Sequence, residues 1–237
     1  MSYVFNALEV IDVTLQFVLI FLLIRGPFRK YLVFSIYAIA ILATTIVEVG
    51  VTLQAHPNAA LFRKIYWSDE VLTDLLLFLT VISLIYLALE SSPLRGKTGR
   101  LLAGIVVIVL ILPFILFHAP FLTDPRQWTP AWGKWFNSTS QILNFGAAIM
   151  NLGLWTALLS SKRRDGQLIM VSIGLGVAVA GQAIGFGVRH FIPDSSALRQ
   201  IPDLFMSLTH AFSVFLWCRA FWRSAPTPPV TEPVTSS

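Results

Sequence analysis

Seven long apolar segments constrain this chain more than any other feature of its sequence. They lie approximately at residues 7–24, 31–54, 67–89, 101–122, 138–160, 168–189 and 203–222. Each could cross a bilayer as a helix, because about 20 apolar residues span the hydrocarbon core. Charged residues make up only 12% of the chain, roughly half the share found in soluble domains. We therefore predict an all-α polytopic membrane protein, with one domain of seven transmembrane helices over residues 1–223.

The connections between the segments indicate how the helices are arranged. Those at residues 25–30, 90–100 and 161–167 are short, and short connections favour antiparallel neighbours in an up-down bundle. Residues 224–237 are rich in proline, serine and threonine. Such a composition cannot build a core, so we expect a disordered tail without an output domain.

The basic residues predict the orientation in the membrane. Eleven of the 17 follow the first, third, fifth or seventh segment: Arg25, Arg29, Lys30, Arg95, Lys97, Arg100, Lys162, Arg163, Arg164, Arg219 and Arg223. By the positive-inside rule, the N-terminus lies outside and the C-terminus in the cytoplasm. The net charge of +5 then reports topology, and the expected partner is the lipid bilayer, not nucleic acid.

Ionisable and amide side chains within the segments crowd toward the predicted outer end. A charged side chain at the centre of a membrane helix costs about 2.5–3.5 kcal/mol, so it normally faces the bundle interior. With a rise of 1.5 Å per residue, five polar residues on five helices lie roughly 9–13 Å from the outer ends. They are Glu48, Asp74, Asn144, Gln182 and His210. This common depth predicts a polar cleft that is open outside and closed toward the cytoplasm.

We expect the ligand contacts of this cleft to come from the polar faces of five helices. The candidates are Glu48, Glu70, Asp74, Asn144, Gln182, Arg189, Ser207 and His210. Three carboxylates would crowd together, with Arg189 and His210 as candidate counter-charges, so a small polar or cationic ligand would suit the site. For Asn144 and Gln182, a hydrogen bond between helices is an equal alternative. Contact with water at the membrane boundary is the simpler interpretation of five acidic residues, the candidate Glu70 among them: Glu9, Asp12, Asp69, Glu70 and Asp203.

Tryptophans are concentrated in the outer loop at residues 123–137. Three occur there at helical spacing: Trp128, Trp132 and Trp135. Tryptophan is enriched at the membrane–water boundary. The pattern therefore predicts a short interfacial helix that anchors the loop.

Small residues occupy one face of the sixth segment. They are Gly174, Ala178, Gly181 and Gly185. Small side chains allow the backbones of membrane helices to approach closely. We predict tight packing inside the bundle, with a dimer interface as the alternative.

The sequence lacks the residues that common cofactors of seven-helix proteins require. All five lysines lie outside the apolar segments, so a retinal Schiff base within a helix is excluded. The histidines are spread over different segments without a His-xxx-His pair, and Cys218 is the only cysteine, so a zinc site is not expected. We predict neither a metal nor another cofactor.

The third segment opens with a short motif, Tyr66-Trp67-Ser68-Asp69-Glu70. The motif and the seven-span topology resemble uncharacterised seven-helix bacterial inner-membrane proteins. The resemblance implies a multi-pass protein of a bacterial plasma membrane and carries no activity with it.

Four functions fit these patterns, and a sensory or ligand-binding protein with a blind outer cleft ranks first. Such a protein would need a separate cytoplasmic signalling partner. A transporter or proton-coupled subunit, with Glu48 and Asp74 carrying protons or cations, is the second hypothesis. An intramembrane lipid hydrolase using the same pair as acid and base is third, so enzymatic activity is not favoured. A purely structural subunit is fourth.

Overall fold

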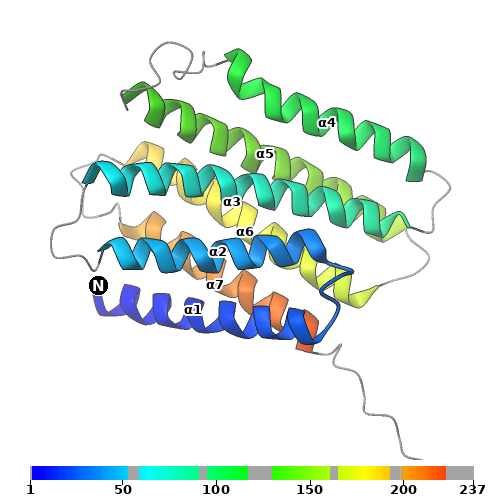
Figure 1. The fold of residues 1–237 in the computed structure, drawn as a ribbon, viewed down its shortest axis with the longest axis horizontal. Coiled ribbons are helices and arrows are strands. Elements are labelled where there is room, and N and C mark those ends of the chain that lie inside the picture. The colour runs from blue at the N-terminus through cyan, green and yellow to red at the C-terminus, as the bar shows by residue number, and fades with distance from the viewer. Residues whose placement is uncertain are drawn as a thin grey trace, which may run out of the picture.

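The structure, a computed structural model, describes residues 2–52, 59–90, 95–116, 130–160, 165–192, 198 and 200–222. Regular structure within these ranges consists of seven α-helices (Figure 1): α1 (Ser2–Arg25), α2 (Leu32–Thr52), α3 (Ala59–Ala88), α4 (Arg95–Leu116), α5 (Pro130–Ser160), α6 (Gly166–Phe191) and α7 (Gln200–Trp222). All seven are long and apolar enough to cross a membrane. The prediction of an all-α chain with seven candidate membrane spans is confirmed.

Six of the helices form a closed ring, and α4 lies outside it. Around the ring the order is α1, α2, α3, α5, α6 and α7, and α7 packs against α1 to close it. In Figure 1 the odd-numbered helices run from left to right and the even-numbered helices return. The peripheral helix α4 packs against α5 and α3. Because α4 is displaced, α3 and α5 become parallel neighbours although a whole helix separates them in the chain.

Aromatic side chains fill the half of the ring near the α1–α2 turn. Trp217 of α7 is completely buried, and its ring meets Phe34 of α2 edge to face, with centroids 5.2 Å apart. Phe221 packs against Phe34 at 5.6 Å and against Tyr31 at 5.3 Å. The indole N–H of Trp217 donates to the backbone carbonyl of Val171 on α6 at 3.1 Å. We call Tyr31, Phe34, Tyr37, Trp217 and Phe221 the aromatic cluster.

The row of small residues on α6 faces α7. A Cβ atom added at three of its glycines would collide with α7 side chains: Gly174 with Trp217, Gly181 with Thr209, and Gly185 with Met206. Only hydrogen at these positions allows the two backbones to come this close. The predicted tight packing inside the bundle is confirmed.

Two helices begin earlier than the apolar segments indicated. The helix α3 starts at Ala59 and α5 at Pro130, because a helix can continue through polar residues beyond the apolar stretch. Trp132 and Trp135 belong to the first turns of α5 and are buried, and Trp135 packs against Phe114 of α4 with centroids 5.4 Å apart. The interpretation of these tryptophans as a separate interfacial helix is therefore wrong. Trp128 lies outside the described residues, as does the tail at 224–237.

An ion pair joins two turns at the end of the bundle where the predicted cytoplasmic basic residues lie. The Lys30 ammonium is 2.9 Å from the Asp165 carboxylate. The other Asp165 oxygen accepts the backbone N–H groups of Gln167 and Leu168 and so caps α6. Partial burial opposes charge on both groups, but their mutual attraction outweighs it, so the pKa of Lys30 is raised and that of Asp165 is lowered.

Candidate functional site

A cavity of about 480 Å³ lies among α1, α2, α3, α6 and α7. It occupies the end of the ring opposite the Lys30–Asp165 pair, because its wall comes from the early turns of α1, α3 and α7 and the later turns of α2 and α6. Its volume falls in the range typical of small-molecule sites, about 300–1,000 Å³. The ionisable and amide side chains in its wall are Glu9, Asp12, Glu48, Asp69, Glu70, Asp74, Gln182 and His210.

The cavity wall is divided into an acidic side and a neutral side. All six carboxylates come from α1, α2 and α3. The described lining residues of α6 and α7 are neutral side chains and one histidine: Ala178, Gln182, Met206, Ser207 and His210. Because no lysine or arginine is among the described lining residues, this part of the wall carries an excess of negative charge.

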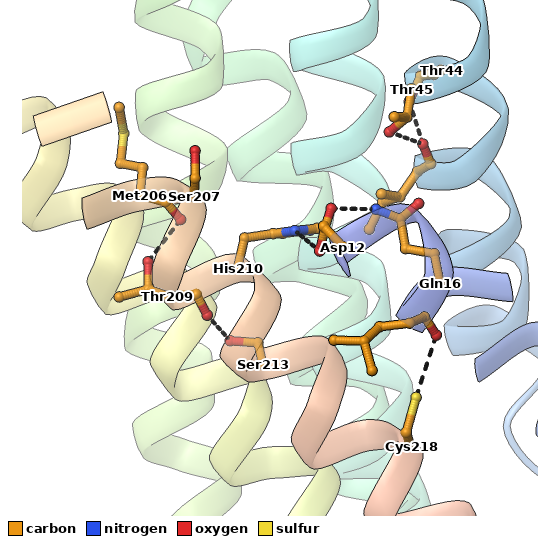
Figure 2. A network of polar contacts seen from close by, with 12 residues as sticks. Asp12, Gln16, Thr44, Thr45, Met206, Ser207, Thr209, His210, Ser213 and Cys218 are labelled. Atoms are coloured by element: carbon orange, nitrogen blue, oxygen red, sulfur yellow. Dashed lines mark hydrogen bonds and ion pairs between the residues drawn. The ribbon is translucent and has the colours of Figure 1, made fainter. Parts of the chain in front are cut away.

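His210 forms the contact between the two sides of the wall (Figure 2). Its Nδ1 lies 3.1 Å from one oxygen of Asp12, and the other Asp12 oxygen accepts a 2.7 Å hydrogen bond from the Gln16 amide. The sequence suggested His210 as a counter-charge of Glu48 or Asp74, whereas the structure pairs it with Asp12. The sequence pattern favoured a place for Asp12 at the membrane boundary, because spacing along one helix does not show which neighbouring helix a residue faces.

Asp74 is the most buried of the cavity carboxylates, with 3% of its surface exposed. Ser140 of α5 donates a hydrogen bond to one of its oxygens. The other oxygen accepts no hydrogen bond from any residue that the structure describes. Asp74 therefore retains unmet hydrogen-bonding capacity at the cavity wall.

Glu48 of α2 is half-buried in the same wall. Within the described ranges its carboxylate has neither a hydrogen bond nor an ion pair. Like Asp74, it can accept a proton or a cation without first breaking an internal contact.

The other predicted ligand contacts divide into two groups. Glu70 and Gln182 line the cavity, as does Ser207, whose hydroxyl donates to the Asp203 backbone carbonyl at 3.0 Å. Asn144 is buried outside the wall and donates a 2.8 Å hydrogen bond to the Gln182 side chain, so it joins α5 to α6. The side chain of Arg189 lies outside the described part of the structure.

Several lining residues were not among the sequence-based candidates. Glu9 and Asp12 belong to a polar stripe on α1 that could have identified them. Asp69, adjacent to Glu70, accepts a 3.2 Å hydrogen bond from Thr73. Tyr37 and Tyr66 also line the cavity. Tyr37 lies within an apolar segment, where a tyrosine gives no sequence signal that separates core from site.

The arrangement suits the binding of a small solute better than metal chemistry. Among the described residues, no group of three histidine, cysteine, aspartate or glutamate side chains converges closely enough to hold a metal ion. The carboxylates are distributed along a chamber, where they can accept hydrogen bonds or compensate positive charge at several depths. Comparisons of the chain with protein-family models, with curated proteins and with solved structures give no match.

Proposed function

We propose that the protein binds a small solute in this cavity, which opens on the non-cytoplasmic side of the membrane and is closed toward the cytoplasm. One observation carries the proposal: the cavity wall includes one member of the aromatic cluster, which fills the other half of the ring. Tyr37 lines the cavity and also contacts Trp217, with ring centroids 6.0 Å apart in an edge-to-face pair. Phe34 and Phe221 continue this packing away from the cavity.

The distribution of basic residues supports the orientation. The turn with Arg25 and Lys30, the start of α4 with Lys97, and the end of α7 with Arg219 all lie at the end opposite the cavity. Cytoplasmic ends of membrane proteins are enriched in lysine and arginine. The cavity end would then face the periplasm or the outside of the cell.

A blind cavity favours a receptor or sensor over a carrier, because a transport path needs polar groups along its whole length. The helix α7 contributes His210 to the cavity and Trp217 to the aromatic cluster. A ligand that displaces His210 would therefore act on a single helix that reaches the basic end. Signalling would be completed by a separate cytoplasmic partner at that end. A proton- or cation-coupled carrier is the second candidate, favoured by the lack of an ion-pair partner for Glu48 among the described residues.

Thiol accessibility tests the orientation and the closed floor. In a Cys218→Ala background, Thr45→Cys and Ser207→Cys place a thiol in the cavity wall, and Lys97→Cys places one at the opposite end. A membrane-impermeant thiol reagent should label the two cavity variants only from outside. It should label the Lys97→Cys control only from the cytoplasmic side.

The alternative outcomes separate the candidate functions. A carrier that exposes its site alternately would be labelled at the cavity positions from both sides. Labelling of Ser207→Cys from the cytoplasmic side alone would contradict both the proposed orientation and the closed floor.

A further inference from the structure

We propose that the solute is an organic cation, an amine or quaternary ammonium compound, whose charged group is bound at the acidic side of the wall, which includes Glu48 and Asp74. This inference rests on the proposed binding function and specifies its ligand.

The charge of the cavity wall favours a cationic ligand. Six carboxylates line the cavity, and the one cationic candidate among the described lining side chains, His210, is already held by Asp12. Glu48 has no partner within the described residues, and the free oxygen of Asp74 belongs to a side chain that is only 3% exposed. A carboxylate in a dry site is stable only when a cation or a proton compensates it. A cationic ligand would supply that charge.

The size and shape of the cavity favour an organic molecule over a metal ion. A chamber of about 480 Å³ holds an organic molecule, whereas a metal ion needs ligands converging within a few ångströms of one point. Tyr37, Ile41 and Met206 add aromatic and apolar surface for the body of such a molecule. The faces of tyrosine rings also attract ammonium groups.

The two sides of the wall differ in the groups that they offer to a ligand. The Gln182 oxygen already accepts the hydrogen bond from Asn144, which leaves the Gln182 amide N–H groups to donate. The Ser207 hydroxyl donates to Asp203, which leaves its oxygen to accept. The neutral side can therefore bind a hydroxyl or carbonyl while the acidic side binds the ammonium group. These features favour a ligand with a charged end and a polar or apolar end.

The test measures binding of defined probes to the purified full-length protein by isothermal titration calorimetry at low and high salt. The probes are tetramethylammonium, choline, putrescine, magnesium chloride and 3,3-dimethyl-1-butanol, the uncharged carbon isostere of choline. We expect at least one ammonium compound to bind, more weakly at high salt, and the neutral isostere to bind at least tenfold more weakly than choline.

Three variants identify the site. Loss of one carboxylate charge beside the ammonium group removes a charge-assisted hydrogen bond from an amine, or Coulomb attraction alone from a quaternary ammonium group, and should weaken the probe by roughly 10- to 100-fold. We expect this for Glu48→Gln, which breaks no contact with described residues, and for Asp74→Asn, which still accepts the bond from Ser140. The control Glu90→Gln removes an exposed carboxylate just beyond the far end of α3 and should leave binding unchanged.

The outcomes distinguish the ligand class from the function. If magnesium binds and no ammonium probe does, or if the neutral isostere binds as tightly as choline, the organic-cation inference is overturned. The proposed binding function survives that result as long as the cavity thiols are labelled only from outside. If no probe binds and the cavity thiols are also unreactive from outside, both proposals fail.

Discussion

Replacement of Trp217 tests how strongly the aromatic cluster holds the bundle together and closes the cavity. The Trp217 side chain is fully buried, forms edge-to-face pairs with Phe34 and Tyr37, and donates to the Val171 carbonyl. Two such ring pairs contribute about 1–3 kcal/mol in total beyond surface burial. The hydrogen bond between helices adds about 0.6 kcal/mol, the average measured in a membrane protein.

These contributions predict that Trp217→Ala lowers the free energy of unfolding by about 3 kcal/mol, the lower end of the usual range for removal of a buried aromatic ring. The lower end applies because the unfolded helices remain in lipid, so the gain from leaving water is absent. Trp217→Phe keeps a ring and loses the hydrogen bond, and should cost about 1 kcal/mol.

Unfolding of purified protein in mixed micelles with increasing dodecyl sulfate, followed by circular dichroism, measures these differences. The matched control is Trp222→Ala, because Trp222 lies in the last turn of the same helix and is 68% exposed. Equal losses for Trp217→Ala and Trp222→Ala would refute the assigned role of the cluster. So would a Trp217→Phe variant as unstable as Trp217→Ala.

Two further predictions concern helix packing and the ion pair between turns. Gly181→Ala places a methyl group against Thr209 and should cost about 1–3 kcal/mol, whereas Gly153→Ala, with nothing within 4 Å of its Cβ, should be neutral or slightly stabilising in the same assay. The pKa of Asp165 is lowered in the folded protein, so its pair with Lys30 stabilises the fold above the unfolded value of 3.8 and loses that contribution as pH falls through the folded pKa. Because the two side chains are 43% and 37% exposed, acidification should lower the free energy of unfolding by less than about 1 kcal/mol through this pair. This contribution should be absent from the pH dependence of unfolding of Asp165→Asn, and an unchanged pH dependence in that variant would refute the assignment.

The polar residues show how far sequence reasoning extends toward the site. The spacing of polar residues along each helix, and their distance from its end, correctly indicated at which end of the bundle the ionisable groups gather. This was possible because polar residues are easily recognised within an otherwise apolar span. The same pattern assigned Asp12 to the membrane boundary. In the structure the Asp12 carboxylate pairs with His210, which lies 198 residues further along the chain. For Asn144 and Gln182 it left two equal interpretations, a ligand contact or a hydrogen bond between helices. The structure places only Gln182 in the cavity wall.

The seven apolar helices, the small face of α6 and the one-sided placement of charge could be predicted from the sequence alone, since each is a property of a single segment. Only the packing of the helices shows that α3 packs against α5, that Trp132 is buried in the bundle, and that carboxylates from three helices share one chamber. The physical reason is that a helix displays several faces whose pairing depends on side-chain packing with other helices. Between membrane helices the hydrophobic effect does not favour one pairing of faces over another. Close packing and a few polar contacts determine the pairing instead.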